Sequence, residues 1–135
     1  MIKTFIIDTP VAKIRTKSFA STKELSVGLE EALNGFFTTA GRFDTGDLLL
    51  VADNGANEPE LRNQMFTVPH YPEPLFGRGV IVGVGEMGQE VDALSDEDWL
   101  IWNVKMVEEF SPDLGVLVST PFAQHPRPET RWVPN

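Results

Sequence analysis

The chain of 135 residues carries 20 acidic and 11 basic side chains, which gives a net charge of −9, and it contains no cysteine. Its length fits a single domain around one hydrophobic core. The lack of cysteine excludes a disulfide scaffold, a thiolate metal site and a cysteine nucleophile. The acidic balance argues against direct binding to nucleic acid, which needs clustered Lys and Arg facing the phosphates.

The sequence contains no segment typical of secretion or membrane insertion. The apolar stretch at its beginning ends at Asp8 and is too short for a signal peptide. The longest apolar runs, at residues 48–52 and 80–82, have the length of strands rather than of a bilayer span. We therefore expect a cytoplasmic protein that does not contact a membrane.

The first two predicted elements are strands. Residues 2–8 are mostly β-branched and aromatic, and Pro10 follows them. In residues 11–19 the basic side chains share one parity: Lys13, Arg15 and Lys17. A strand with one basic, solvated face is typical of a sheet edge, where lysines discourage pairing with another chain.

A helix is predicted after the second strand. The run from Ser21 to Glu24 fits a capping box, in which the Ser21 hydroxyl accepts from the Glu24 amide and the Glu24 carboxylate reaches back to the Ser21 amide. Apolar residues follow at helical spacing: Leu25, Leu29, Ala32 and Leu33. Asn34 and Gly35 supply a left-handed stop.

Strands are also predicted at residues 36–43, 47–52, 79–84 and 115–119. Residues 56–77 contain four prolines, so we expect little regular structure there. The remaining stretch, residues 99–110, has apolar residues at both helical and strand spacing. The capping pattern from Ser95 to Asp98 favours a helix over this stretch.

Together these elements predict an α+β fold. We expect a mixed or antiparallel sheet of four to six strands with one or two helices packed on it. Residues 1–120 are interpreted as one domain. Residues 121–135, which contain four prolines, are interpreted as a mobile tail.

The negative charge is concentrated in residues 86–113, which hold nine acidic residues and one basic residue. Such a run usually faces water. It can also offer carboxylates to a basic partner, with neighbouring aromatic side chains as anchors. The residues of this candidate partner surface are Asp92, Asp96, Glu97, Asp98, Trp99 and Trp102.

No pattern in the sequence points to a cofactor, a metal or a catalytic group. Gly83, Gly85 and Gly88 match the spacing of a dinucleotide-binding loop, but the acidic residues after them would repel a pyrophosphate. We interpret these glycines as the turn of a hairpin. A metal-dependent hydrolase is the least favoured reading, because the sequence shows neither a ligand cluster nor a nucleophile elbow.

Three stretches carry a resemblance to a known family. They are Asp53-Asn54-Gly55, then Leu61-Arg62-Asn63-Gln64, then the Gly-flanked valine strand from Leu75 to Val84. With the preceding strands and helix, residues 1–94 resemble a family of small proteins of unknown function from phages and mobile elements. The resemblance implies a phage or plasmid origin, and it implies no enzymatic residues.

The sequence therefore leaves two functions open. The first is a non-enzymatic interaction protein, encoded by a phage or mobile element, that inhibits a host defence protein by stoichiometric binding to its basic surface. The alternative is a protein that binds a small nucleotide signal with the proline-rich loop, where aromatic rings stack on a base and an arginine holds a phosphate. The residues of this alternative site are Phe66, His70, Tyr71 and Arg78.

Overall fold

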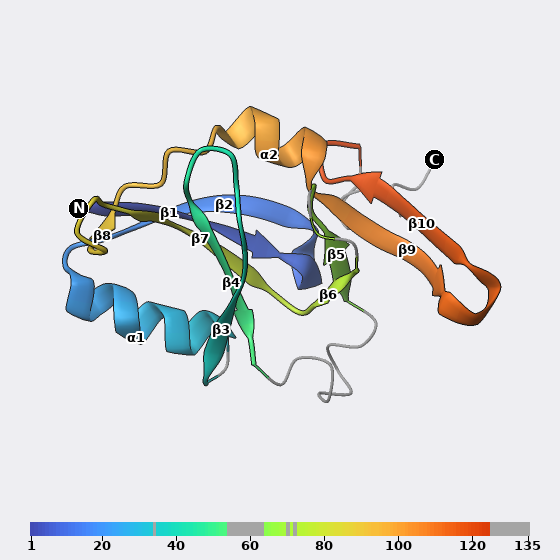
Figure 1. Ribbon diagram of the computed structural model, residues 1–135, viewed down its shortest axis with the longest axis horizontal. Coiled ribbons are helices and arrows are strands. Elements are labelled where there is room, and N and C mark those ends of the chain that lie inside the picture. The colour runs from blue at the N-terminus through green and yellow to red at the C-terminus, as the bar shows by residue number, and fades with distance from the viewer. Residues whose placement is uncertain (34, 54–63, 70, 72, 125–135) are drawn as a thin grey trace, which may run out of the picture.

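A computed structural model describes residues 1–33, 35–53, 64–69, 71 and 73–124 of the chain. It contains two antiparallel sheets, of six and four strands, with two helices packed on them (Figure 1). The predicted α+β class is confirmed, and the pairing is antiparallel throughout. The second sheet is a feature that the sequence did not predict.

The larger sheet has the strand order β2-β1-β7-β4-β3, and β8 pairs with β7 beside this path. Its strands are β1 (Ile2–Asp8), β2 (Lys13–Phe19), β3 (Phe37–Arg42), β4 (Leu48–Ala52), β7 (Gly79–Val84) and β8 (Glu90–Val91). The basic strand β2 lies at one edge of this sheet with Lys13, Arg15 and Lys17 exposed, as predicted. Strands β7 and β8 form the hairpin that the glycine-rich stretch predicted.

Helix α1 (Thr22–Leu33) covers one face of the larger sheet (Figure 1). Its leucines pack against every second residue of the central strands: Leu25, Leu29 and Leu33 against Ile6, Leu50, Val80 and Val82. The Ser21 hydroxyl accepts from the Glu24 amide, as predicted, but the Glu24 carboxylate accepts from the amide of Ala20 rather than of Ser21. Of the predicted stop, Gly35 has a positive φ of 114° and its amide donates to the carbonyl of Glu30 at 2.9 Å, whereas Asn34 lies outside the described residues.

The opposite face of the larger sheet packs against the smaller sheet and helix α2 (Glu97–Asn103). The smaller sheet has the order β10-β9-β5-β6. Its strands are β5 (Met65–Thr67), β6 (Leu75–Phe76), β9 (Lys105–Ser111) and β10 (Val116–Pro121). Side chains from both sheets and α2 form one apolar cluster around Ile7, Leu49, Phe66, Ile81 and Leu100. The alternation of apolar residues along β1, β4 and β7 therefore serves two cores, one on each face.

The prediction of a helix over residues 99–110 was wrong in its second half. The helix ends at Asn103, and the backbone at Val104 is already extended. The strand that follows pairs with β10 and, at Met106, with Phe66 of β5. Pairing with two strands distant in the sequence therefore overrides the helical spacing of this stretch.

The chain remains packed beyond the predicted start of the tail. Phe122 is buried, and its amide donates to the carbonyl of Val104 at 3.1 Å. The amide of Ala123 donates to the carbonyl of Ile101 at 2.7 Å. Phe122 and Ala123 thus secure the end of α2, and residues 125–135 lie outside the described part of the chain.

Candidate interaction surface

Asp92, the first residue of the candidate partner surface, is held by the fold itself. Its Oδ1 accepts a hydrogen bond from the amide of Lys3 at 2.8 Å. The next amide, of Ala93, donates to the carbonyl of Lys3 at 2.9 Å. Asp92 therefore fastens the segment before α2 to the first strand, and its carboxylate is partly used inside the molecule.

Asp47, which the sequence analysis did not single out, fixes the next part of this segment. Its buried carboxylate accepts from the amide of Leu94 at 3.0 Å, from the amide of Ser95 at 2.8 Å and from the Ser95 hydroxyl at 2.6 Å. Hydrogen bonds to a buried carboxylate are among the strong ones. Asp47 therefore sets where helix α2 begins. An isolated Asp before an apolar strand is too common a pattern to reveal this role.

Asp96 is the N-cap of α2, one residue later than the capping box predicted. Its Oδ2 accepts from the amide of Trp99 at 3.1 Å. The predicted cap, Ser95, is engaged by Asp47 instead. Asp96 therefore stabilises the helix start, and like Asp92 it has a structural role.

Glu97 and Asp98 occupy the first turn of α2 and are exposed. Acidic residues favour this position because the helix N-terminus carries partial positive charge. Neither carboxylate forms a hydrogen bond or ion pair with another residue that the structure describes. Of the four predicted acids, these two are the ones the fold leaves available to a partner.

Two tryptophans lie beside these carboxylates. Trp99 is 41% exposed and rests edge-on against Phe43, with ring centroids 6.1 Å apart. Trp102 is 52% exposed and lies one helical turn after Asp98, so the two side chains are neighbours on the helix. Leu94, just before the helix, is 71% exposed. We call Leu94, Glu97, Asp98, Trp99 and Trp102 the acidic–aromatic surface.

A groove of about 430 Å³ runs along one side of this surface, between α2 and the start of β2. Its apolar lining includes Ile14, Ile101 and Phe122, and Trp102 also lines it. Glu97 lines it from the helix and Lys13 lines it from β2. The groove can therefore receive a long side chain whose stem is apolar and whose end is charged.

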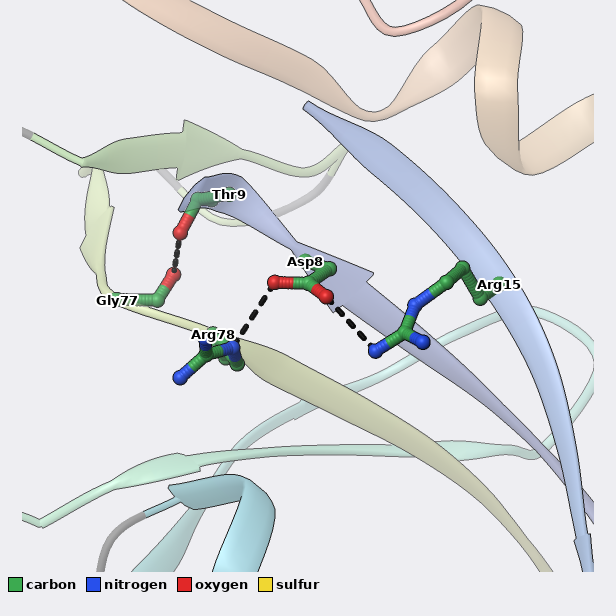
Figure 2. A network of polar contacts seen from close by, with 5 residues as sticks. All are labelled: Asp8, Thr9, Arg15, Gly77 and Arg78. Atoms are coloured by element: carbon green, nitrogen blue, oxygen red, sulfur yellow. Dashed lines mark hydrogen bonds and ion pairs between the residues drawn. The ribbon is translucent and has the colours of Figure 1, made fainter. Parts of the chain in front are cut away.

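Of the residues of the alternative, nucleotide-binding site, the three that the structure describes, Phe66, Tyr71 and Arg78, do not form an exposed stacking platform. Phe66 is fully buried in the core between the sheets, and His70 lies outside the described residues. Arg78 donates from Nε to Asp8 Oδ1 at 2.9 Å (Figure 2). The other oxygen of Asp8 accepts from Arg15 at 2.7 Å, so the carboxylate joins β1 to β2 and to the residue just before β7. Arg78 therefore has a structural partner.

Tyr71, the remaining residue of that set, lines a cavity of about 80 Å³ together with Arg42 and Phe43. Sites for small molecules have volumes of roughly 300–1,000 Å³. A cavity of this size has room for a few water molecules but not for a nucleotide.

The described residues contain no group of three or more His, Cys, Asp or Glu side chains arranged to hold a metal ion. Neither α1 nor α2, the α-helices of the described chain, has the length and apolar character needed to cross a membrane.

Comparison of the chain with protein-family models, with curated proteins and with solved structures found no match. The resemblance of residues 1–94 to a phage and mobile-element family stays a prediction.

Proposed function

We propose that this protein binds another protein stoichiometrically, through the acidic–aromatic surface, and that the partner presents a basic surface. The observation that carries the proposal is the pair of exposed tryptophans, Trp99 and Trp102, beside two carboxylates that the fold does not use. The function is binding rather than catalysis.

Charge supports a basic partner. The stretch of residues 86–113 has a net charge of −8, and its exposed carboxylates at Glu97 and Asp98 lie at one end of α2. Opposite charge on a partner speeds the encounter and suppresses wrong partners. Complementarity of this kind weakens as salt is raised, since exposed charges are screened within about 8 Å at physiological ionic strength.

The aromatic side chains supply the apolar part of the contact. Tryptophan is enriched among the residues that dominate binding energies, because it buries a large area with few rotatable bonds. The groove beside Trp102 has Glu97 on its α2 side and Lys13 on its β2 side, so we expect an arginine or lysine side chain of the partner to enter it along α2. The aliphatic stem would pack on Ile101 and the cation would approach Glu97.

The proposed class of partner is based on the predicted resemblance to phage and mobile-element proteins. On that basis we propose a host protein as the partner, in the host cytoplasm, and inhibition of a host defence protein as the outcome. A defence protein with a basic nucleic-acid-binding groove would suit an acidic ligand, which would compete with the phosphates.

The test is affinity capture from host-cell lysate, followed by titration of the purified partner. Glu97→Lys with Asp98→Lys reverses the two available carboxylates and leaves Asp92 and Asp96 to hold the fold. We expect the dissociation constant to rise by more than about tenfold, and we expect added salt to weaken the wild-type complex.

The matched control is Glu30→Lys with Glu31→Lys on the exposed side of α1. It changes the net charge by the same amount at a distant site, so we expect binding within about twofold of wild type. Equal loss in both double variants would mean that only overall charge matters. Wild-type binding by the α2 double variant would refute the proposed surface.

A further inference from the structure

The four strands at the ends of the two main sheet paths, β2, β3, β6 and β10, are protected to different degrees. Strand β2 carries Lys13, Arg15 and Lys17, β3 is interrupted by a bulge at Ala40, and β6 is only two residues long. Strand β10, at the end of the smaller sheet, has no charged residue in Val116–Pro121. Lysines, prolines, bulges and very short strands are the usual means by which proteins prevent pairing at sheet edges, and the one proline of β10, Pro121, is its last residue. Among these four edge strands, β10 is the one that is both uncharged and longer than two residues, so its edge is open to pairing.

Strands β9 and β10 also form an arm that projects from the rest of the molecule (Figure 1). Strand β5 pairs with β9 at Met106 and Lys105, and the remainder of β9 pairs with β10. The arm exposes four large apolar side chains: Phe110, Leu114, Leu117 and Val118. A two-stranded hairpin is marginally stable in water by itself, so a further strand would stabilise this one.

We propose that the outer edge of β10 pairs with β10 of a second copy of this chain. Two copies related by a two-fold axis would place these strands antiparallel, in the order β9-β10-β10-β9. Every cross-strand pair would then come from Val116–Pro121, so no like charges would face each other. Leu117 and Val118 project from opposite faces of the strand, and both would lose solvent contact.

The positions of the acidic residues select β10 rather than β9 as the contact. Strand β9 carries Glu108 and Glu109, and Glu108 is the extra residue of a bulge opposite β10. Pairing through β9 would bring these carboxylates together with those of the second copy. In the β10 pairing the two β9 strands lie about 14 Å apart, which is three strand spacings. That separation exceeds the screening length of about 8 Å.

The dimer contact and the contact with a basic partner should respond in opposite ways to salt concentration. Each copy has a net charge of −9, so the two copies repel each other at long range. Raising the salt concentration should therefore strengthen the dimer, whereas it should weaken the complex with a basic protein. Failure of one proposal thus leaves the other intact.

The test is sedimentation equilibrium of the full chain. An interface of one six-residue strand is small, so we expect a dissociation constant on the order of 10 µM. Leu117→Lys and Val118→Lys each place two like charges near the two-fold axis, and each should raise this constant by about tenfold or more. Both side chains are already exposed in the single chain, so the variants should fold.

The control is Val27→Lys on the exposed side of α1, which should leave the dimer unchanged. Because Leu117 and Val118 lie on opposite faces, either variant can decide the question if the other fails to fold. A wild-type chain that is monomeric at about 1 mM would overturn the proposal. So would a dimer that both lysine variants leave unchanged.

Discussion

The two hairpins β1–β2 and β9–β10 have the same turn geometry, but the first is packed in the cores and the second is largely exposed. Each closes with a short 3-10 turn that contains a proline, Thr9–Val11 in one and Pro112–Leu114 in the other. A residue with left-handed backbone follows in both, Ala12 at φ 53° and Gly115 at φ 67°. Its amide donates back to the carbonyl at the start of the turn, at 3.1 and 3.2 Å.

The difference begins beyond the turn. Strand β1 lies between β2 and β7, and its side chains enter the cores on both faces of the larger sheet. The outer part of β9 has β10 as its partner strand and no core on either face. Local sequence therefore sets the turn, while the elements packed around a hairpin decide whether its side chains stabilise the fold or remain open to a partner.

The largest expected difference concerns matched truncations in the two hairpins. Ile7→Ala removes a fully buried side chain of β1 and should lower the free energy of unfolding by about 3–4 kcal/mol. Leu117→Ala removes a side chain of β10 that is 44% exposed and should lower it by less than about 1 kcal/mol. Urea denaturation of both variants measures the difference.

This comparison requires a protein concentration well below the proposed dimer dissociation constant, since dimerisation would add stability that depends on concentration. A loss at Leu117 as large as that at Ile7 would mean that the arm belongs to the cooperative core of the single chain. That result would contradict the distinction between the two hairpins.

Smaller changes in the free energy of unfolding, of opposite sign in the two hairpins, are expected at the left-handed residue of each turn. Gly115→Ala should lower the free energy of unfolding by about 1 kcal/mol, because an L side chain disfavours this backbone region. No atom lies within 4 Å of the position that its Cβ would take, so the effect comes from the backbone alone. Ala12→Gly should raise stability by about 0.5 kcal/mol, since relief of strain exceeds the entropy that glycine adds to the unfolded chain.

Urea denaturation again provides the measurement for both turn variants. Because one variant introduces alanine and the other introduces glycine, each variant controls for the general effect of the other substitution on the free energy of unfolding. If both variants lowered the stability, the two turns would not be equivalent in energy, and the shared backbone geometry would be only a similarity of shape.

Elements determined by nearby residues were predictable from the sequence. The hydroxyl of Ser21 and the following leucines place α1 correctly. The apolar run bounded by glycines gives β7 its observed limits, and the alternating basic residues identify β2 as an edge strand. In each case the interactions that decide the structure lie within a few residues of one another.

Features that depend on distant residues were not predictable. Asp47 holds the start of α2 through Leu94 and Ser95, which lie almost 50 positions away. The change from helix to strand after Asn103 depends on pairing with β5 and β10. For the candidate surface, the acids and tryptophans that the sequence indicated lie on α2 and on the segment just before it. The sequence could not separate Glu97 and Asp98 from Asp92 and Asp96, whose oxygens bind backbone amides.

The proposal that the acidic–aromatic surface contacts the partner can be tested through the tryptophans themselves. Trp132→Phe leaves Trp99 and Trp102 as the two tryptophans of the chain. The measurement is quenching of their fluorescence by acrylamide, a neutral quencher, with and without the captured partner. We predict that the bound partner lowers the quenching constant by about twofold or more, because both rings become buried. If the partner binds this variant with unchanged affinity but leaves the quenching constant unchanged, the acidic–aromatic surface does not contact the partner.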